Sequence, residues 1–167
     1  APSTTALAQR HDRIRESLDT LSLDALIVTP PSNIRYLSNH AGSAGILVAT
    51  RETVHLLVDF RYHEAVRALQ GSASACPGLQ LWDVPASYEE ALIACLADIG
   101  VTTVGFEAAH VTVARYEWWR ETIAGRGLRT DGVEIHRHDV ATPPTTRTFR
   151  RWAARRPPAS GRCRSAA

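Results

Sequence analysis

The apolar residues of this chain follow two periods that alternate along the sequence. Short runs rich in aliphatic and β-branched residues predict strands, and they occupy residues 23–29, 46–50, 54–59, 79–84, 101–106 and 133–140. Between these runs, apolar positions three and four residues apart predict amphipathic helices. The helices are expected over residues 6–21 and 32–37, and after Asp59, Ser87 and Thr112.

This alternation predicts an α/β fold in one domain, residues 1–140, which is long enough to bury a core. A polar turn at residues 50–53 joins two predicted strands as a hairpin. The expected architecture is a six-stranded mixed sheet, mostly parallel and flanked by helices on both faces. Ser32 is expected to cap the short helix, and Ser87 with Glu90 forms a capping-box pattern at the start of a later helix.

Charge divides the chain near Ala141. All 17 acidic residues precede this position, and the segment that follows it has seven arginines and no acid. Every basic residue in the chain is arginine. Residues 141–167 are rich in Arg, Pro, Ala and Ser and have no hydrophobic period, so we expect a disordered tail. A shifted reading frame through GC-rich DNA is a second interpretation of this change in composition.

The sequence predicts a cytoplasmic protein. It has no run of 18 apolar residues, which argues against a membrane span. The first ten residues are polar and lack the apolar core of a signal peptide. Three cysteines without framework spacing favour a reducing compartment.

Three patterns in the sequence were compared with known chemical motifs, and none meets the requirements of its motif. Ser43 lies in Ala-Gly-Ser-Ala-Gly, but a nucleophile elbow needs a strand before the serine and a helix after it, and here a strand follows. His136 and His138 share one face of a predicted strand, but a zinc site needs three or four ligands. There is no Gly-Lys-Ser/Thr phosphate loop, because the chain has no lysine. No catalytic or metal-binding residue is predicted.

Three segments in register carry a family resemblance. Residues 24–38, DALIVTPPSNIRYLS, resemble the "D-A-L-L-V … P-x-N-I-x-Y-L" signature of the creatinase/prolidase/aminopeptidase P N-terminal domain. Residues 59–62, DFRY, look like its "D-x-R-Y", and residues 104–107, VGFE, look like its "[IV]-G-F-E". The resemblance covers residues 9–140. Asn39 departs from it, because the family usually has glycine there, but asparagine also tolerates a positive φ.

The resemblance implies an Xaa-Pro metallopeptidase family in which this domain is not catalytic. Catalysis would belong to a following pita-bread domain that holds two divalent metal ions, usually Mn, Co or Zn. Because the bridging helix and that domain are not found in this sequence, we expect no cofactor in this chain. Proline-containing peptides would be substrates only where a catalytic domain is present.

The resemblance also implies oligomer contacts and loops that overhang an active site, often that of a neighbouring subunit. The matching loop is residues 39–45, and His40 is the side chain expected to reach a partner's site. Arg61 is the second candidate, with a salt bridge to Asp59 or Glu64 as an equally open interpretation. The loop residues Asn39 and Ser43 complete the gating candidates. The remaining motif residues are expected to be structural: Asn33, Tyr36, Asp59, Tyr62 and Glu107.

The expected function is therefore that of a non-catalytic N-terminal domain with oligomerisation and substrate-gating roles. The expected partner is a second copy or a full-length relative. One alternative is a stand-alone interaction module that pairs with such a relative. Another is a nucleic-acid binder that uses the basic tail, although nucleic acid is not the favoured partner.

Overall fold

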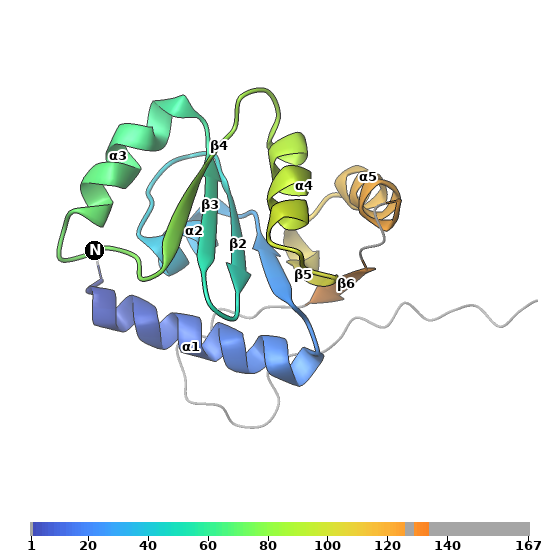
Figure 1. Ribbon diagram of the computed structural model, residues 1–167, viewed down its shortest axis with the longest axis horizontal. Helices are drawn as coiled ribbons and strands as arrows, with labels where there is room; N and C mark the ends of the chain where they lie inside the picture. Colours follow the sequence, from blue (N-terminus) through green and yellow to red (C-terminus); the bar gives the residue numbers. More distant parts are fainter. Residues whose placement is uncertain (1, 126–128, 134–167) are drawn as a thin grey trace, which may run out of the picture.

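The computed structural model describes residues 2–125 and 129–133, and it has three layers (Figure 1). One mixed sheet forms the middle layer, and helices cover both of its faces. The elements in chain order are α1 (Thr4–Leu21), β1 (Ala25–Val28), α2 (Pro31–Ser38), β2 (Ile46–Thr50), β3 (Val54–Val58), α3 (Phe60–Gln70), β4 (Leu79–Asp83), α4 (Tyr88–Asp98), β5 (Thr103–Glu107), the 3-10 helix η1 (Ala108–His110), α5 (Val113–Ala124) and β6 (Arg129–Val133). The α/β class expected from the sequence is confirmed.

The strands lie in the order β4-β3-β2-β1-β5-β6. β2 is antiparallel to both β1 and β3, and the β2–β3 pair is the predicted hairpin. The other neighbouring pairs are parallel: β1 with β5, β3 with β4, and β5 with β6. The sheet is therefore mixed, as the sequence indicated. β1, β3, β4, β5 and β6 all point the same way, so their carboxyl ends share one edge of the sheet.

Each face of the sheet has its own hydrophobic core. α1, α2 and α3 cover one face, where Leu7, Leu18 and Ile34 are almost completely buried against alternate residues of β1, β2 and β3. α4 and α5 cover the opposite face with Leu92, Leu96 and other apolar side chains. In Figure 1, α3 and α4 lie on opposite sides of the strands. Strands buried on both faces explain the continuous apolar runs in the sequence.

At most helix N-termini, the side chain of the N-cap residue accepts a hydrogen bond from a backbone amide of the first turn. The Ser87 side chain accepts from the Glu90 amide at the start of α4, and the Thr112 side chain accepts from the Arg115 amide at the start of α5. The predicted cap at Ser32 is wrong. α2 begins one residue earlier, at Pro31, and its N-cap residue Pro30 makes no side-chain bond. Proline suits the first helical turn because its φ is fixed near the helical value and that turn needs no amide donor.

The last strand of the described residues lies before the last strand that the apolar pattern predicted. The structure has β6 at Arg129–Val133, whereas the apolar pattern suggested residues 133–140. The segment Arg-Thr-Asp-Gly-Val has little apolar periodicity, and a strand at the edge of a sheet needs less of it. Residues 134–140, with His136 and His138, lie outside the described residues, as does the segment 141–167. Among the helices of the described part, none combines the length and apolarity needed to cross a bilayer.

Candidate functional site

The resembling segments meet at the carboxyl edge, which we define as the edge where β1, β3, β4 and β5 end. Asn33 follows β1, Asp59 follows β3, and Glu107 ends β5. The loop of residues 39–45 reaches the same edge because it precedes β2, which runs in the opposite direction. Parallel strands thus gather residues from three distant parts of the sequence.

Asn33 and Glu107 form a direct link across this edge. The Asn33 amide Nδ2 donates to Glu107 Oε1, and Glu107 is only 2% exposed. Burial of a carboxyl group is costly unless a hydrogen-bond donor faces it, and the Asn33 amide is such a donor. The bond ties the start of α2 to the end of β5. That both residues are structural, as the family resemblance implied, stays a prediction.

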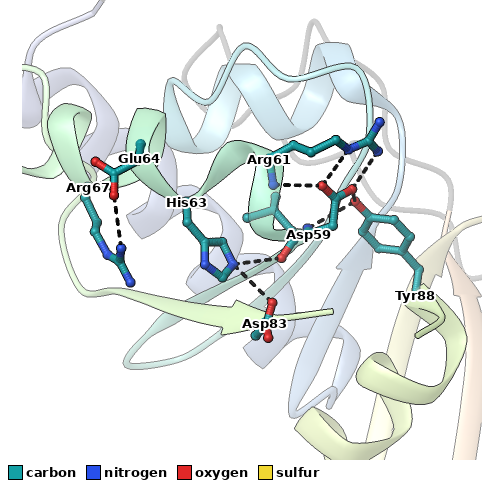
Figure 2. Close-up of polar contacts among 8 residues, drawn as sticks. Asp59, Arg61, His63, Glu64, Arg67, Asp83 and Tyr88 are labelled. Carbon is teal, nitrogen blue, oxygen red and sulfur yellow. Dashed lines mark hydrogen bonds and ion pairs between the residues drawn. The ribbon is translucent and has the colours of Figure 1, made fainter. Parts of the chain in front are cut away.

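Asp59 is the centre of a second polar group, shown in Figure 2. It caps α3 through the Arg61 backbone amide, and the Arg61 guanidinium donates from Nε to Oδ1 and from Nη2 to Oδ2, each at 2.8 Å. The Tyr88 hydroxyl donates to Oδ2 at 3.0 Å. The bonds from Arg61, followed by those from Tyr88, hold the pKa of Asp59 well below its usual range.

Arg61 has the ion pair that the sequence left open, and the partner is Asp59. The same pair raises the pKa of the guanidinium. The arginine side chain is still 64% exposed. Its neighbour Phe60 is 78% exposed, although it is a large apolar residue. Together, Phe60 and Arg61 form an exposed step at the carboxyl edge, which we call the Phe60–Arg61 step.

Two residues of α3, His63 and Arg67, make further polar contacts near this step, which the sequence did not indicate. His63 Nε2 lies 3.3 Å from Asp83 Oδ1 and 3.2 Å from the carbonyl oxygen of Val58. Arg67 pairs with Glu64 at 3.4 Å, and both side chains are exposed. In Figure 2 these residues continue along α3, away from the Asp59 group. The His63 contacts tie α3 to the ends of β3 and β4.

Asn39 anchors the first residue of the 39–45 loop. Its φ is 64°, which is the left-handed conformation. Asparagine tolerates this conformation, although the family usually has glycine at this position. Its side-chain amide donates to the carbonyl oxygens of Pro2 and Ser74, each at 2.9 Å. Asn39 is 8% exposed. Its side chain holds the N-terminus and the 71–78 segment against α2, and it is directed inward.

His40 is also directed inward, which corrects the expectation that it projects from the loop. The residue is 4% exposed, and its ring meets the Tyr62 ring edge-on with centroids 5.3 Å apart. Gly42 closes over the imidazole, because a Cβ atom on Gly42 would lie 2.2 Å from His40 Nε2. Sequence reasoning placed His40 in a loop but had no signal that a glycine two residues later would cover it.

Ser43 is the exposed polar group of the loop. Its hydroxyl lies 2.9 Å from the Tyr62 hydroxyl, which joins the loop to α3. Tyr36 has a different partner: the Arg10 guanidinium lies 3.8 Å from its ring centroid, and Arg10 donates to the Tyr36 carbonyl oxygen. Arg10 was not singled out in the sequence, because nothing local marks its contact with α2.

The described residues contain no group of three or more His, Cys, Asp or Glu side chains placed to hold a metal ion. Cys76 and Cys95 are both buried, and burial raises the pKa of each thiol to about 12. Neither thiol is therefore activated as a nucleophile. The polar groups described at the carboxyl edge are bonded mainly to one another.

The model of the creatinase/prolidase N-terminal domain matches residues 10–133. The chain belongs to this family. The domain is of the kind found at the N-terminus of Xaa-Pro peptidase-like proteins. The three segments that resembled the family signature therefore mark a genuine relationship, and their side chains meet at the carboxyl edge.

Individual relatives agree with this assignment. The chain is 23% identical over 117 residues to the uncharacterized peptidase YqhT of Bacillus subtilis (strain 168), covering 70% of this chain and 31% of YqhT. It is similar to the Xaa-Pro dipeptidase of Bacillus anthracis, with a TM-score of 0.65, 20% identity and coverage of 77% and 34%. It also matches the N-terminal domain of the cytoplasmic peptidase PepQ of Mycobacterium tuberculosis H37Rv, with a TM-score of 0.63, 24% identity and coverage of 79% and 95%. The chain thus spans about a third of the longer relatives.

Proposed function

We propose that this domain limits access of peptides to a metallopeptidase active site that a separate catalytic domain supplies. The carboxyl edge carries the proposal. There the Phe60–Arg61 step is exposed, and Asp59 holds the Arg61 guanidinium through hydrogen bonds of 2.8 Å. An exposed aromatic ring beside a cation is suited to contact a peptide or the rim of a neighbouring site.

The chemistry of hydrolysis is assigned to the catalytic domain. A two-metal peptidase site needs several carboxylate and imidazole ligands around the ions. The described residues do not offer such a set. We therefore propose that Mn, Co or Zn ions and the scissile Xaa-Pro bond are held by a catalytic domain, either in the same polypeptide or in an associated one, and we derive no step of hydrolysis from this domain.

A second proposal is self-association, or association with a full-length relative. Its support is the exposure of large apolar side chains that the two cores do not use: Phe60 at 78%, Val113 at 73% and Trp118 at 39%. Trp118 and Val113 lie on α5, on the opposite face of the sheet from α3. The size of the particle in solution, measured by light scattering over a range of concentrations, tests this proposal. We also propose a cytoplasmic location, in line with the description of PepQ.

A domain exchange tests the proposal that this domain limits peptide access. This domain replaces the N-terminal domain of an active Xaa-Pro peptidase to give a grafted enzyme (the graft), and kcat/KM is measured for Xaa-Pro peptides of increasing length. The proposal expects the length preference of the graft to differ from that of the parent enzyme, while the rate on the shortest substrate is retained. An unchanged length preference in a folded, active graft would contradict it. The isolated chain, supplied with Mn and an Xaa-Pro peptide, should show no turnover.

A further inference from the structure

The imidazole of His40 is enclosed in a site that accepts only its neutral form. The residue is 4% exposed, and Nε2 is buried without a hydrogen-bond partner among the described residues. The backbone of Ala44, four residues along the same loop, lies near the ring.

Gly42 lies directly against the unpartnered nitrogen. A Cβ atom on Gly42 would be 2.2 Å from Nε2 and 2.7 Å from Cε1 of the same ring. A second proton on Nε2 would point toward this backbone, where the described residues offer no acceptor. Protonation in place would thus create a buried cation with one unsatisfied donor, which is strongly unfavourable.

The groups around His40 would not stabilise a positive charge on its ring. On α3, the ring faces Tyr62, and the Arg61 cation lies 5.6 Å from the Tyr62 ring centroid while paired with Asp59. At the end of α2, the cation of Arg10 and the imidazole of His11 bond to the carbonyl oxygens of Tyr36 and Leu37. Burial is the largest influence on His40 and lowers its pKa, and the Ala44 carbonyl opposes it. No described carboxylate contributes to that shift.

We propose that His40 is a proton-sensitive latch, which holds the loop of residues 39–45 closed while its ring is neutral and releases the loop when the ring is protonated. Release moves the ring into water, where the cation is hydrated. Gly42 and the Ser43–Tyr62 bond then lose their fixed positions, because both depend on the closed loop. This inference concerns the conformation of the loop and stands whether or not the loop gates an active site.

The direction of the pH effect follows from linkage. In the open loop the ring titrates near its ordinary pKa of 6.5, and in the closed loop its pKa is lower. The closed state therefore has its full stability above pH 6.5 and loses it as the pH falls below that value. Between pH 6.5 and the pKa of the closed form, the ratio of open to closed loop rises by up to about tenfold for each pH unit.

The experiment uses the full chain labelled with ¹⁵N. Long-range ¹H–¹⁵N spectra report the tautomer and titration of the His40 ring, and hydrogen exchange of the amides of residues 41–45, corrected for intrinsic exchange, reports the open fraction. We expect a neutral His40 ring at pH 7.5, and an open fraction that rises about fivefold between pH 6.5 and 5.5. His40→Gln should remove this rise, and the control His63→Gln should keep it.

Gly42→Ala provides an independent variant. Its methyl group would occupy the space of the imidazole, so we expect His40 to leave its site, to titrate near pH 6.5, and to leave the loop open at pH 7.5. A His40 ring that is protonated at pH 7.5 would overturn the proposal. So would a wild-type open fraction that does not change with pH, or a Gly42→Ala loop that stays closed over a buried ring.

Discussion

Asn33 donates a hydrogen bond to Glu107 across 74 residues of sequence, and this bond joins the first and third segments of the family signature. Their pairing fixes the start of α2 relative to the end of β5, and so positions the carboxyl edge.

Replacing Asn33 by alanine should lower the free energy of unfolding by about 1.5–3 kcal/mol, because the buried carboxylate of Glu107 loses a donor. Urea unfolding at pH 7 measures the change. Arg35→Ala is the matched control, since Arg35 is an exposed residue of the same helix, and it should cost less than about 0.5 kcal/mol. Equal effects of the two substitutions would contradict the role given to Asn33.

Asn39 allows its backbone and its side chain to be tested separately. Asn39→Ala and Asn39→Gly both remove the bonds to Pro2 and Ser74, but only alanine also has to adopt φ of 64° with a Cβ atom. The free energy of unfolding of Asn39→Ala should therefore be about 1 kcal/mol lower than that of Asn39→Gly. Thermal or urea unfolding of both variants gives this difference. A glycine variant as unstable as the alanine variant would mean that the left-handed backbone costs nothing here.

Asp24 should make the free energy of unfolding depend on pH in the acidic range. Its carboxylate accepts from the Thr102 hydroxyl and from the amides of Thr102 and Thr103, and these bonds, with Thr102 first, lower its pKa from 3.8 to about 2. The contribution is complete above pH 3.8 and is lost as the pH falls through 2. After a discount for solvent screening it is worth about 1 kcal/mol.

The measurement for Asp24 compares the unfolding free energies of the wild type and Asp24→Asn between pH 6 and pH 2. The difference should be constant down to pH 4 and should shrink below it. Asp12→Asn is the control, because Asp12 pairs with Arg15 at the exposed surface of α1. A difference that does not change with pH would show that Asp24 acts through shape and not through charge.

Much of the fold was predictable because its elements depend on local patterns. β1, β2 and β3 are buried on both faces, so their sequences are continuous apolar runs, and the Ser87 cap follows from residues within one turn. β6 was not predictable in place, since Arg129–Val133 is a polar edge strand whose pairing with β5 comes from tertiary structure. Its register depends on a partner 26 residues earlier.

The segments that resembled the family signature could be found in the sequence, but the sequence did not show how their side chains are oriented. In the structure these segments reach the same edge of the sheet. The direction of His40 depends on Gly42 and on Tyr62 from another element, and no spacing in the sequence encodes that contact. The choice between Asp59 and Glu64 as the partner of Arg61 likewise required coordinates, since both lie within reach along the chain.

The central claim is that the Phe60–Arg61 step limits access to a peptidase site. The most direct measurement is kcat/KM against peptide length for the grafted enzyme, with Phe60→Ala and Arg61→Ala compared with Arg67→Ala, an exposed arginine further along α3. We predict that the two step variants shift the length preference several-fold and leave the shortest substrate unaffected, while Arg67→Ala matches the unmodified graft. Identical length profiles for all variants would contradict the claim.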